Sequence, residues 1–249
     1  MEQKIKKPAA CLPEKEKMEA LGRLSCKVAH DFNNILGAIE GYASLCLNGV
    51  KKEDPLAQDL LEIRALVAKG AGLGKQLLVF GGRQLLNRVP CGVNALIERT
   101  LERPEFAPSG NFKMETRLEP GLPGIIADAA QLEQALANLL LNAREAMTGG
   151  GTAVVSSTSE RLEAGADPHG AGGLFVKISI RDTGPGLRPE VLQHLFEPLF
   201  STTKRGLGTG LGLSFVYGVA KQHGGWAEAR NGPGGGSEFS LFLPAGEAR

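Results

Sequence analysis

The hydrophobic and polar positions divide the chain into two parts with different patterns. In the first part, from residue 14 onward, apolar residues recur at three- and four-residue steps, which is the spacing of one helix face. The members of this stripe are Leu21, Leu24, Val28, Ile35, Ile39, Tyr42 and Leu45. A second stripe of the same spacing runs from Leu56 to Phe80. The pattern therefore predicts two long helices.

The residues between the two stripes favour a tight reversal of the chain. Asn48-Gly49 is a typical end for the first helix, and Asp54-Pro55 is a cap followed by a first-turn proline. Three glycines interrupt the second stripe, namely Gly70, Gly72 and Gly74. Each weakens a helix by about 1 kcal/mol relative to alanine, but the apolar stripe continues through them. We therefore expect an antiparallel helical hairpin.

A hairpin of this kind cannot bury both of its apolar stripes by itself. Two hairpins can bury them together in a four-helix bundle. The sequence therefore predicts a homodimer.

After Val89-Pro90 the pattern changes to alternating strands and helices, which indicates one α+β domain from about residue 93. Helices are expected at 93–106, 128–147, 188–195 and 211–223, the second of them capped by Asp128. Strands are expected at 111–118, 152–159, 174–181, 226–230 and 237–243. Residues 160–173 have the composition of a hairpin loop or an insertion.

Composition and charge narrow the class of protein only a little. The 249 residues are 42% hydrophobic and 22% charged, as in soluble globular proteins, and the net charge of +1 gives no electrostatic reason to expect nucleic acid or an anionic membrane as a partner. The cysteines lie too far apart for a zinc or iron–sulfur motif. No apolar run reaches the roughly 18 residues of a membrane span. We expect a cytoplasmic protein without direct membrane insertion.

The first candidate for chemistry is the segment HDFNN at residues 30–34, in the middle of the first helix. A neutral histidine can attack phosphorus through one ring nitrogen if an acceptor holds the proton of the other, and Asp31 could be that acceptor for His30. Asn34 lies four residues on, on the same helix face, and could orient a water. A surface His/Asp pair without a function is the alternative.

Three further segments suggest a nucleotide site. Asn138 and Asn142 share one helix face, and an amide oxygen is a suitable ligand for Mg²⁺. Asp182 starts the segment DTGPG after an apolar strand; it could accept a hydrogen bond from the adenine amino group and so favour ATP over GTP. The glycine-rich segment 206–213 precedes a helix, whose N-terminus can hold phosphates, and Lys204 could supply a charge to them.

Six motifs in this order resemble the histidine kinase family, in its HDFNN variant: HDFNN, NLLLNAREAM, DTGPG, FEPLF, GLGTGLGL and GPGGGSEF. Each motif alone is weak evidence. The six occur in the family's order and with plausible spacing within residues 20–245, and together they are very specific. The resemblance implies an α+β fold, with a helical hairpin followed by an α/β-sandwich ATP-binding domain of the Bergerat type. It also implies a flexible tail at 1–13, a dimerisation and phosphoacceptor domain at 14–88, and an ATP-binding catalytic domain at 93–247.

The resemblance also implies a role for individual residues. His30 matches the phosphoacceptor, Asp31 its acid/base partner, and Asn34 the position linked to phosphatase activity. Asn142 matches the magnesium ligand and Asn138 a companion that faces the phosphates. The residues that match the binding site for the rest of ATP are Asp182, Gly184, Gly186 and Ser237 around the adenine, and Gly208, Thr209, Gly210, Leu211 and Gly212 over the phosphates.

The implied function is autophosphorylation of His30 with ATP and Mg²⁺. The phosphoryl group then passes to an aspartate on the receiver domain of a separate response regulator, and phosphatase activity on that regulator is a further possibility. Residues 1–13 are too short for a sensor domain, so the chain is expected to be either an excised core or the partner of a separate sensory protein.

Two alternatives from other classes remain open. One is a phosphotransfer or scaffold protein with a degenerate ATP site, against which Asn142, Asp182 and the glycines argue. The other is a chaperone, topoisomerase or serine/threonine-directed kinase with the same ATP-binding fold. The hairpin that carries His30 argues against this second class.

Overall fold

The computed structural model describes residues 15–51, 54–82, 85–107, 110–168, 170, 172–201 and 209–246. It divides the chain into two compact units: a hairpin unit, Glu16–Gln84, and a sheet unit that begins at Leu85. The tail predicted for residues 1–13 lies outside the described residues.

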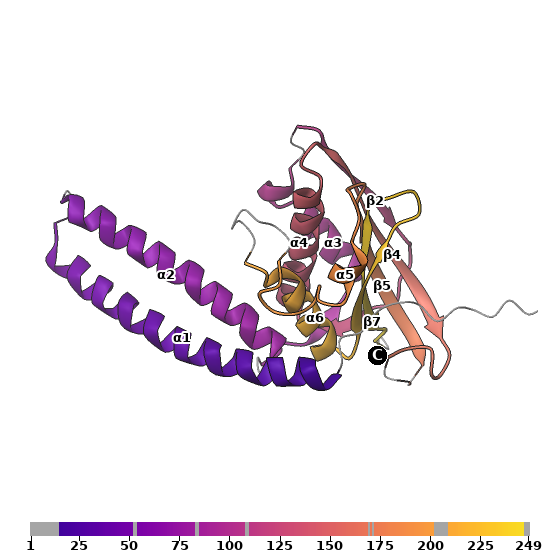
Figure 1. The fold of residues 1–249 in the computed structure, drawn as a ribbon, viewed down its shortest axis with the longest axis horizontal. Coiled ribbons are helices and arrows are strands. Elements are labelled where there is room, and N and C mark those ends of the chain that lie inside the picture. Colours follow the sequence, from indigo (N-terminus) through magenta and orange to yellow (C-terminus); the bar gives the residue numbers. More distant parts are fainter. Residues whose placement is uncertain are drawn as a thin grey trace, which may run out of the picture. The chain divides into compact units, whose positions relative to one another are not determined.

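The hairpin unit consists of two long antiparallel helices, α1 (Lys15–Gly49) and α2 (Pro55–Phe80) (Figure 1). The Asp54 side chain caps α2 by accepting a hydrogen bond from the backbone N–H of Leu56 at 2.9 Å. An ion pair between Arg64 Nε and Glu40 Oε1, 2.7 Å apart, joins the two helices. The predicted helical hairpin is therefore confirmed.

Two of the three glycines of α2 allow α1 to approach closely. A Cβ on Gly74 would lie 2.5 Å from Oδ1 of Asn33, and a Cβ on Gly70 would lie 3.0 Å from Cδ1 of Leu36. At Gly72, by contrast, no atom lies within 4 Å of such a Cβ. The intrinsic cost of glycine in a helix is therefore balanced by packing at Gly70 and Gly74, but not at Gly72.

This difference leads to a prediction about the stability of the hairpin. Gly74→Ala should lower the free energy of unfolding by about 1–3 kcal/mol, because the methyl group overlaps the Asn33 amide. Gly72→Ala should raise it by about 0.5–1 kcal/mol, because alanine fits the space and is the better helix former. Urea unfolding of the two variants, followed by the helical circular dichroism signal, measures both changes. Equal effects of the two substitutions would contradict the packing argument.

Large apolar side chains remain exposed along both helices of the hairpin. They are Leu24, Val28, Phe32, Ile35, Ile39, Tyr42 and Leu45 on α1, and Leu56, Leu61, Ile63 and Leu66 on α2. Tyr42 is 71% exposed and Leu66 65%. The observation agrees with the expectation that one hairpin cannot bury both apolar stripes.

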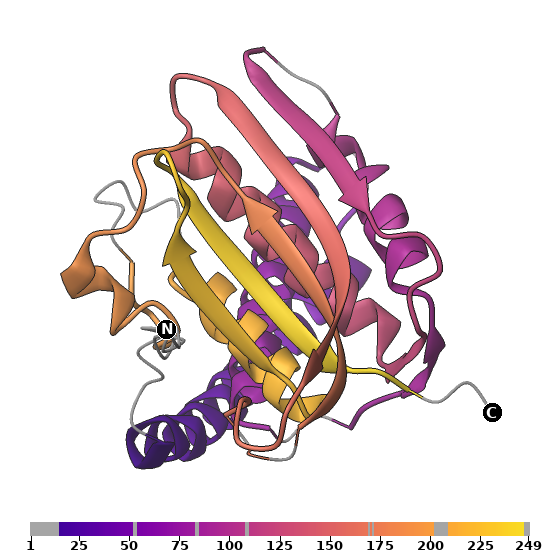
Figure 2. The same ribbon diagram turned by 90° about the vertical axis from the view of Figure 1, so that its right-hand side faces the viewer.

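The sheet unit is built on a five-stranded mixed sheet with the order β2-β4-β5-β7-β6. Its strands are β2 (Phe112–Leu118), β4 (Gly151–Leu162), β5 (Gly173–Arg181), β6 (Trp226–Asn231) and β7 (Ser237–Pro244). Only β2 and β4 run parallel; the other neighbours are antiparallel. Helices α3 (Val93–Leu101), α4 (Ala129–Ala146) and α6 (Gly212–Gln222) lie along one face of the sheet (Figure 2). This arrangement confirms the predicted fold class of the second part.

The two faces of the central strands are buried in different ways. On the helix side, β5 and β7 contribute Val176, Ile178, Ile180, Leu241 and Leu243, all almost fully buried. The opposite face carries an aromatic cluster of Phe175, Trp226 and Phe242, in which Trp226 and Phe242 stack with their ring centroids 4.5 Å apart. The strand β7, which lies between β5 and β6, is buried along almost its whole length.

Three details of the predicted secondary structure were wrong. The helix predicted at 93–106 ends at Leu101, and a 3-10 turn, η1 (Pro104–Phe106), follows, because Pro104 has no N–H with which to continue the helix. The helix predicted at 188–195 shrinks to α5 (Pro189–Leu192). The predicted loop at 160–173 is shorter, because β4 continues to Leu162 and β5 begins at Gly173.

A small second sheet had no signal in the sequence. It pairs β1 (Val89–Cys91) with β3 (Ile125–Ala127) in antiparallel orientation. Strands of three residues are too short to display a two-residue alternation. Among the residues that the structure describes, no helix is both long and apolar enough to cross a membrane.

Candidate functional site

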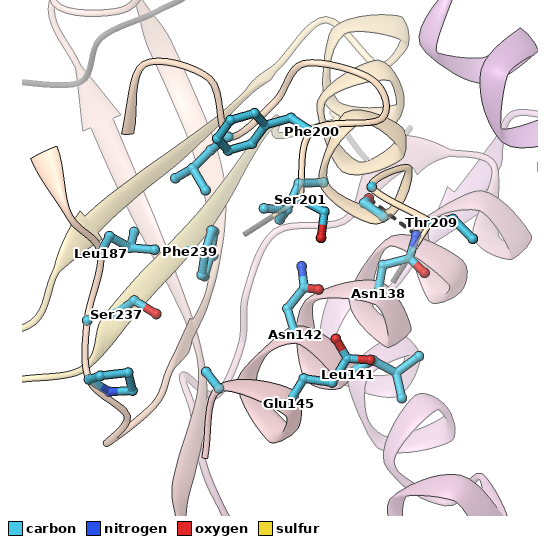
Figure 3. Close-up of a pocket in the computed structure, with 17 residues that line it drawn as sticks. Asn138, Leu141, Asn142, Glu145, Leu187, Phe200, Ser201, Thr209, Ser237 and Phe239 are labelled. Atoms are coloured by element: carbon cyan, nitrogen blue, oxygen red, sulfur yellow. Dashed lines mark hydrogen bonds between the residues drawn. The ribbon is translucent and has the colours of Figure 1, made fainter. Parts of the chain in front are cut away.

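A cavity of about 390 Å³ lies in the sheet unit. Its walls come from α4, from the start of α6, from β7 and from the segment that follows β5. Its volume falls within the range of small-molecule sites, about 300–1,000 Å³. Figure 3 shows Ser237, Phe239 and Leu187 on one side of the cavity and Asn138 and Thr209 on the other. Among the described residues, the wall near Leu187 and Phe239 is largely apolar, and the wall near Asn138 and Thr209 is polar.

Helix α4 contributes the polar floor of the cavity. Asn138, Asn142 and Glu145 follow one another at four- and three-residue steps and line the cavity from one helix face (Figure 3). The Asn138 amide is engaged within the protein: its Nδ2 donates to the carbonyl of Gly212 at 3.4 Å, and its Oδ1 accepts from Gln134 Nε2 at 3.2 Å. Asn142 differs, because its Nδ2 is buried and has no hydrogen-bond partner among the described residues.

The start of α6 gives the cavity an end that suits an anion. Thr209, Gly210 and Gly212 line the cavity, and the first N–H groups of a helix have no carbonyl partner within the helix. The backbone N–H of Leu199 donates to the Gly210 carbonyl at 3.0 Å, and both residues have positive φ angles, 65° and 66°. A Cβ on Gly210 would lie 2.5 Å from the backbone carbonyl carbon of Leu199. Only glycine therefore fits at residue 210.

On the opposite side, the carboxylate of Asp182 holds two segments together. Asp182 is 1% exposed; its Oδ1 accepts from the N–H groups of Gly184 at 2.7 Å and Ser237 at 3.2 Å, and its Oδ2 accepts from the Ser237 hydroxyl. Ser237 lines the cavity, and the Asp182 carboxylate joins it to Gly184. An ionised carboxylate has about four acceptor positions, so these three bonds leave one.

The segment Pro185-Gly186-Leu187 forms part of the same wall and is clamped by Asn231 of β6. Oδ1 of Asn231 accepts from the N–H of Leu187 at 2.6 Å, and its Nδ2 donates to the Leu187 carbonyl at 2.9 Å. The carboxamide thus pairs with Leu187 as a neighbouring backbone would. Gly186, with φ of 78°, allows the chain to turn there.

The N-terminus of α4 is joined to the end of α6 through a buried histidine. His223 Nε2 accepts from the N–H of Asp128, the N-cap of α4, at 3.0 Å, while its Nδ1 donates to the Val219 carbonyl at 2.7 Å. The bond at Nε2 requires the neutral imidazole, because a protonated Nε2 could not accept from Asp128. Desolvation by burial lowers the pKa of His223 below its ordinary 6.5, helped by the charge of Arg88 and opposed by the bond to Val219 and the charge of Asp128.

The lowered pKa of His223 predicts a loss of stability in acid. Because the unfolded chain takes up the proton first as the pH falls, the free energy of unfolding should decrease below about pH 6.5 and should be independent of this group above that pH. His223→Gln should remove this part of the pH dependence. Urea unfolding at pH 7.5 and pH 5.5 tests the prediction, and an unchanged difference between the two pH values in the variant would contradict it.

In the hairpin unit, His30 lies in the middle of α1 with its side chain 72% exposed. Its Nδ1 is 3.3 Å from Oδ1 of Asp31 and 3.4 Å from Nδ2 of Asn34. Both neighbours therefore lie at the same ring nitrogen. When the Nδ1 proton points to Asp31, the unprotonated Nε2 is left to react.

The structure brings together most of the residues predicted for the nucleotide site. Those that line the cavity are Asn138, Asn142, Gly186, Thr209, Gly210, Gly212 and Ser237. Leu211 is buried at the start of α6, and Asp182 is hydrogen-bonded to Gly184 and to Ser237, which lines the cavity. Lys204 and Gly208 lie outside the described residues.

Asn231, His223 and Glu145 were not assigned any role from the sequence. Asn231 and His223 act through partners that are distant in the chain, so no local signal could have identified them. Glu145 could have been found, since it lies three residues after Asn142 on the same helix face.

The residues present fit a magnesium–nucleotide complex. Amide and carboxylate oxygens are the hard ligands that Mg²⁺ prefers, and Asn142 and Glu145 offer both at one end of the cavity. The unsatisfied Nδ2 of Asn142 costs about 1–3 kcal/mol in the free protein. A bound polar ligand that supplies an acceptor to this amide would recover that cost.

Comparison with known proteins agrees with this geometry. Residues 127–247 match the family described as histidine kinase-, DNA gyrase B-, and HSP90-like ATPase. The chain is 35% identical over 238 residues to the sensor kinase CckA of Brucella abortus, covering 94% of this chain and 25% of CckA. It is 33% identical over 243 residues to the sensor histidine kinase ZraS of Escherichia coli, covering 96% of this chain and 48% of ZraS.

A solved structure supports the same arrangement of elements. Full-length ShkA, crystallised in complex with AMPPNP, matches with a TM-score of 0.63 at 24% identity, over 89% of this chain and 45% of ShkA. At that identity the likeness concerns the fold alone. The chain spans a quarter of the length of CckA and about half of the length of ZraS.

The sheet unit is thus an ATPase domain of the histidine kinase, gyrase B and HSP90 type. With its helical hairpin, the chain belongs to the sensor histidine kinases, of which it forms the catalytic core.

Proposed function

We propose that the chain binds ATP in the cavity of the sheet unit and transfers its γ-phosphoryl group to His30. The observation that carries the proposal is the state of His30: the imidazole is 72% exposed, and its Nδ1 lies 3.3 Å from Oδ1 of Asp31. A buried imidazole could not reach a nucleotide, and one without an acceptor at Nδ1 would not be held in the reactive tautomer.

The polarity of the cavity supports one orientation of the nucleotide. The purine lies at the side of Ser237 and Phe239, where the fourth acceptor position of Asp182 can take one N–H of the adenine amino group. The phosphates lie at the side of Asn142 and the N-terminus of α6, where N–H groups are available. Guanine presents a carbonyl at the corresponding position, so this orientation favours ATP over GTP.

Asn142 would hold Mg²⁺, and Glu145 lies on the same face of α4. The bound cation would neutralise charge on the phosphate oxygens. The described residues of α6 contribute backbone N–H groups, and Asn142 offers its unpartnered Nδ2 to an acceptor of the ligand. These residues would orient the triphosphate.

In the transfer step, Nε2 of His30 attacks the γ-phosphorus in line with the leaving oxygen. The new bond is P–N, the bond that breaks joins the γ-phosphorus to the β,γ-bridging oxygen, and ADP leaves with that electron pair. The Nδ1 proton stays on the ring and is donated in a hydrogen bond to Asp31. The Asp31 carboxylate stabilises the positive charge that develops on the ring.

The exposed apolar stripes of the hairpin support a homodimer. Contiguous exposed apolar surface of this extent is unusual on a monomer, and the stripes run along both helices, from Leu24 to Leu45 and from Leu56 to Leu66. A second copy of the hairpin covers them in a four-helix bundle. Phosphorylation can then occur within one chain or between the two.

The phosphohistidine would pass its phosphoryl group to an aspartate on the receiver domain of a separate response regulator. Asn34, whose Nδ2 lies 3.4 Å from the His30 ring, is suited to orient a water during hydrolysis of the phosphorylated regulator. The input signal would come from a further domain or a separate sensory protein. These steps follow the two-component pattern of the sensor kinases that the chain resembles.

Incubation of the purified chain with γ-labelled ATP and Mg²⁺ tests the proposal. We expect label on the protein that is lost in acid and retained in base, as for a phosphoramidate. The absence of protein-bound label would favour a phosphotransfer scaffold over a kinase.

A further inference from the structure

We propose that Glu145 makes nucleotide binding in the cavity depend on a divalent cation, by disfavouring the free nucleotide and interacting with the cation or its bound water. The inference rests on the proposed function, since it assumes that the cavity holds a nucleotide. It concerns a residue to which the sequence analysis gave no role.

Glu145 is the one charged side chain among the described residues that line the cavity. Figure 3 shows its carboxylate beside Leu141 and Asn142, directed toward the side of Asn138 and Thr209. That side is the one at which the helix N-terminus receives the phosphates. A negative side chain therefore stands where the most negative part of the ligand is expected.

The charge of Glu145 is not neutralised within the described part of the chain. It forms no hydrogen bond or ion pair there. Glu133, on the same helix, shows the contrast: its carboxylate is paired with Arg99 at 2.6 Å and with Arg103 at 3.4 Å. The carboxylate of Glu145 is therefore available to interact with a ligand in the cavity.

Whether Glu145 weakens or strengthens nucleotide binding depends on the cation. A carboxylate repels a free nucleoside triphosphate at short range, and solvent screens this repulsion only in part, although Glu145 is exposed. A divalent cation bound to the phosphates reverses the sign, because carboxylate oxygens are favourable for Mg²⁺ directly or through its waters. Since Asn142 is neutral, Glu145 alone among the described lining residues can make this distinction.

The experiment measures the coupling between cation and nucleotide. The affinity for ADP and for a non-hydrolysable ATP analogue is determined by calorimetry, once with Mg²⁺ and once with EDTA, for the wild type and for Glu145→Gln. The ratio of the two affinities expresses the coupling, which is reciprocal between the two ligands. For Glu145→Gln we expect the ratio to fall by about tenfold, with tighter binding in EDTA and weaker binding with Mg²⁺.

Two further variants complete the design. Glu145→Lys should bind the nucleotide in EDTA more tightly than the wild type, because the charge at this position is reversed. Glu98→Gln removes the same charge from an exposed position on α3 that does not line the cavity, and its ratio should equal that of the wild type.

The outcomes separate this inference from the proposed function. If the wild type binds nucleotide and the ratio is unchanged in Glu145→Gln, the inference is wrong and the proposed function stands. If the wild type binds no nucleotide under either condition, the proposed site itself is wrong. Because Glu145 is exposed and glutamine has the same shape, thermal unfolding of the variant should match the wild type and exclude a folding defect.

Discussion

Asp182→Asn is expected to weaken the binding of ATP by at least about 100-fold, because each lost bond to a buried charged acceptor removes about 1.5–3 kcal/mol. In the protein, the carboxylate accepts from the N–H groups of Gly184 and Ser237 and from the Ser237 hydroxyl. In the variant, the NH₂ group of the asparagine replaces one acceptor oxygen. It would face an N–H or O–H donor, with which it cannot form a hydrogen bond. The substitution therefore removes the acceptor for adenine and loosens the wall at Ser237.

The affinity of wild type and variant for ATP, measured by calorimetry, tests this prediction. Asp167→Asn is a matched control, since Asp167 is also a buried aspartate that accepts from a backbone N–H, that of Gly172 at 2.6 Å, but it lies in the β4–β5 connection and does not line the cavity. We expect the control to bind ATP as the wild type does. Equal losses in both variants would indicate a general effect on stability and not a contact with the purine.

His30→Gln is expected to abolish phosphorylation and leave nucleotide binding unchanged. Glutamine has no nucleophilic nitrogen, so the loss should exceed about 1,000-fold in the rate of labelling, as for removal of a covalent nucleophile. The fold should be preserved, because the side chain is 72% exposed and its polar contacts are to Asp31 and Asn34 of its own helix.

The rate of protein labelling and the affinity for ATP are measured on the same preparation of His30→Gln. Lys27→Gln, an exposed substitution on the same helix, should keep both properties. If His30→Gln retained its label, another residue would be the phosphoacceptor. If it lost nucleotide binding as well, the separation of the two functions between the two units would be wrong.

Features that depend on local spacing could be predicted from the sequence. The four-residue step between Asn138 and Asn142 was enough to predict that both lie on one face of α4, and the adjacency of His30 and Asp31 was enough to predict their contact. The hairpin was predicted in the same way, from apolar residues at helical steps. In each case the geometry of one helix relates the residues directly.

Features that depend on distant segments could not be predicted in this way. Asn231 and Leu187 are 44 residues apart, and His223 and Asp128 are 95 apart, so only the folded sheet brings them together. The same holds for Gly74, which is understood only once Asn33 of α1 packs against it. The short strands β1 and β3 are stabilised by their mutual pairing, which no periodicity of three residues can reveal.

The central claim is that the terminal phosphoryl group of a nucleotide reaches one imidazole on α1. Digestion of the labelled wild-type chain and identification of the phosphorylated peptide by mass spectrometry at neutral to alkaline pH tests it most directly. We predict a single acid-labile phosphoryl group on the peptide that contains His30. An acid-stable phosphate on a serine or threonine, or label on a peptide of the sheet unit, would contradict the account.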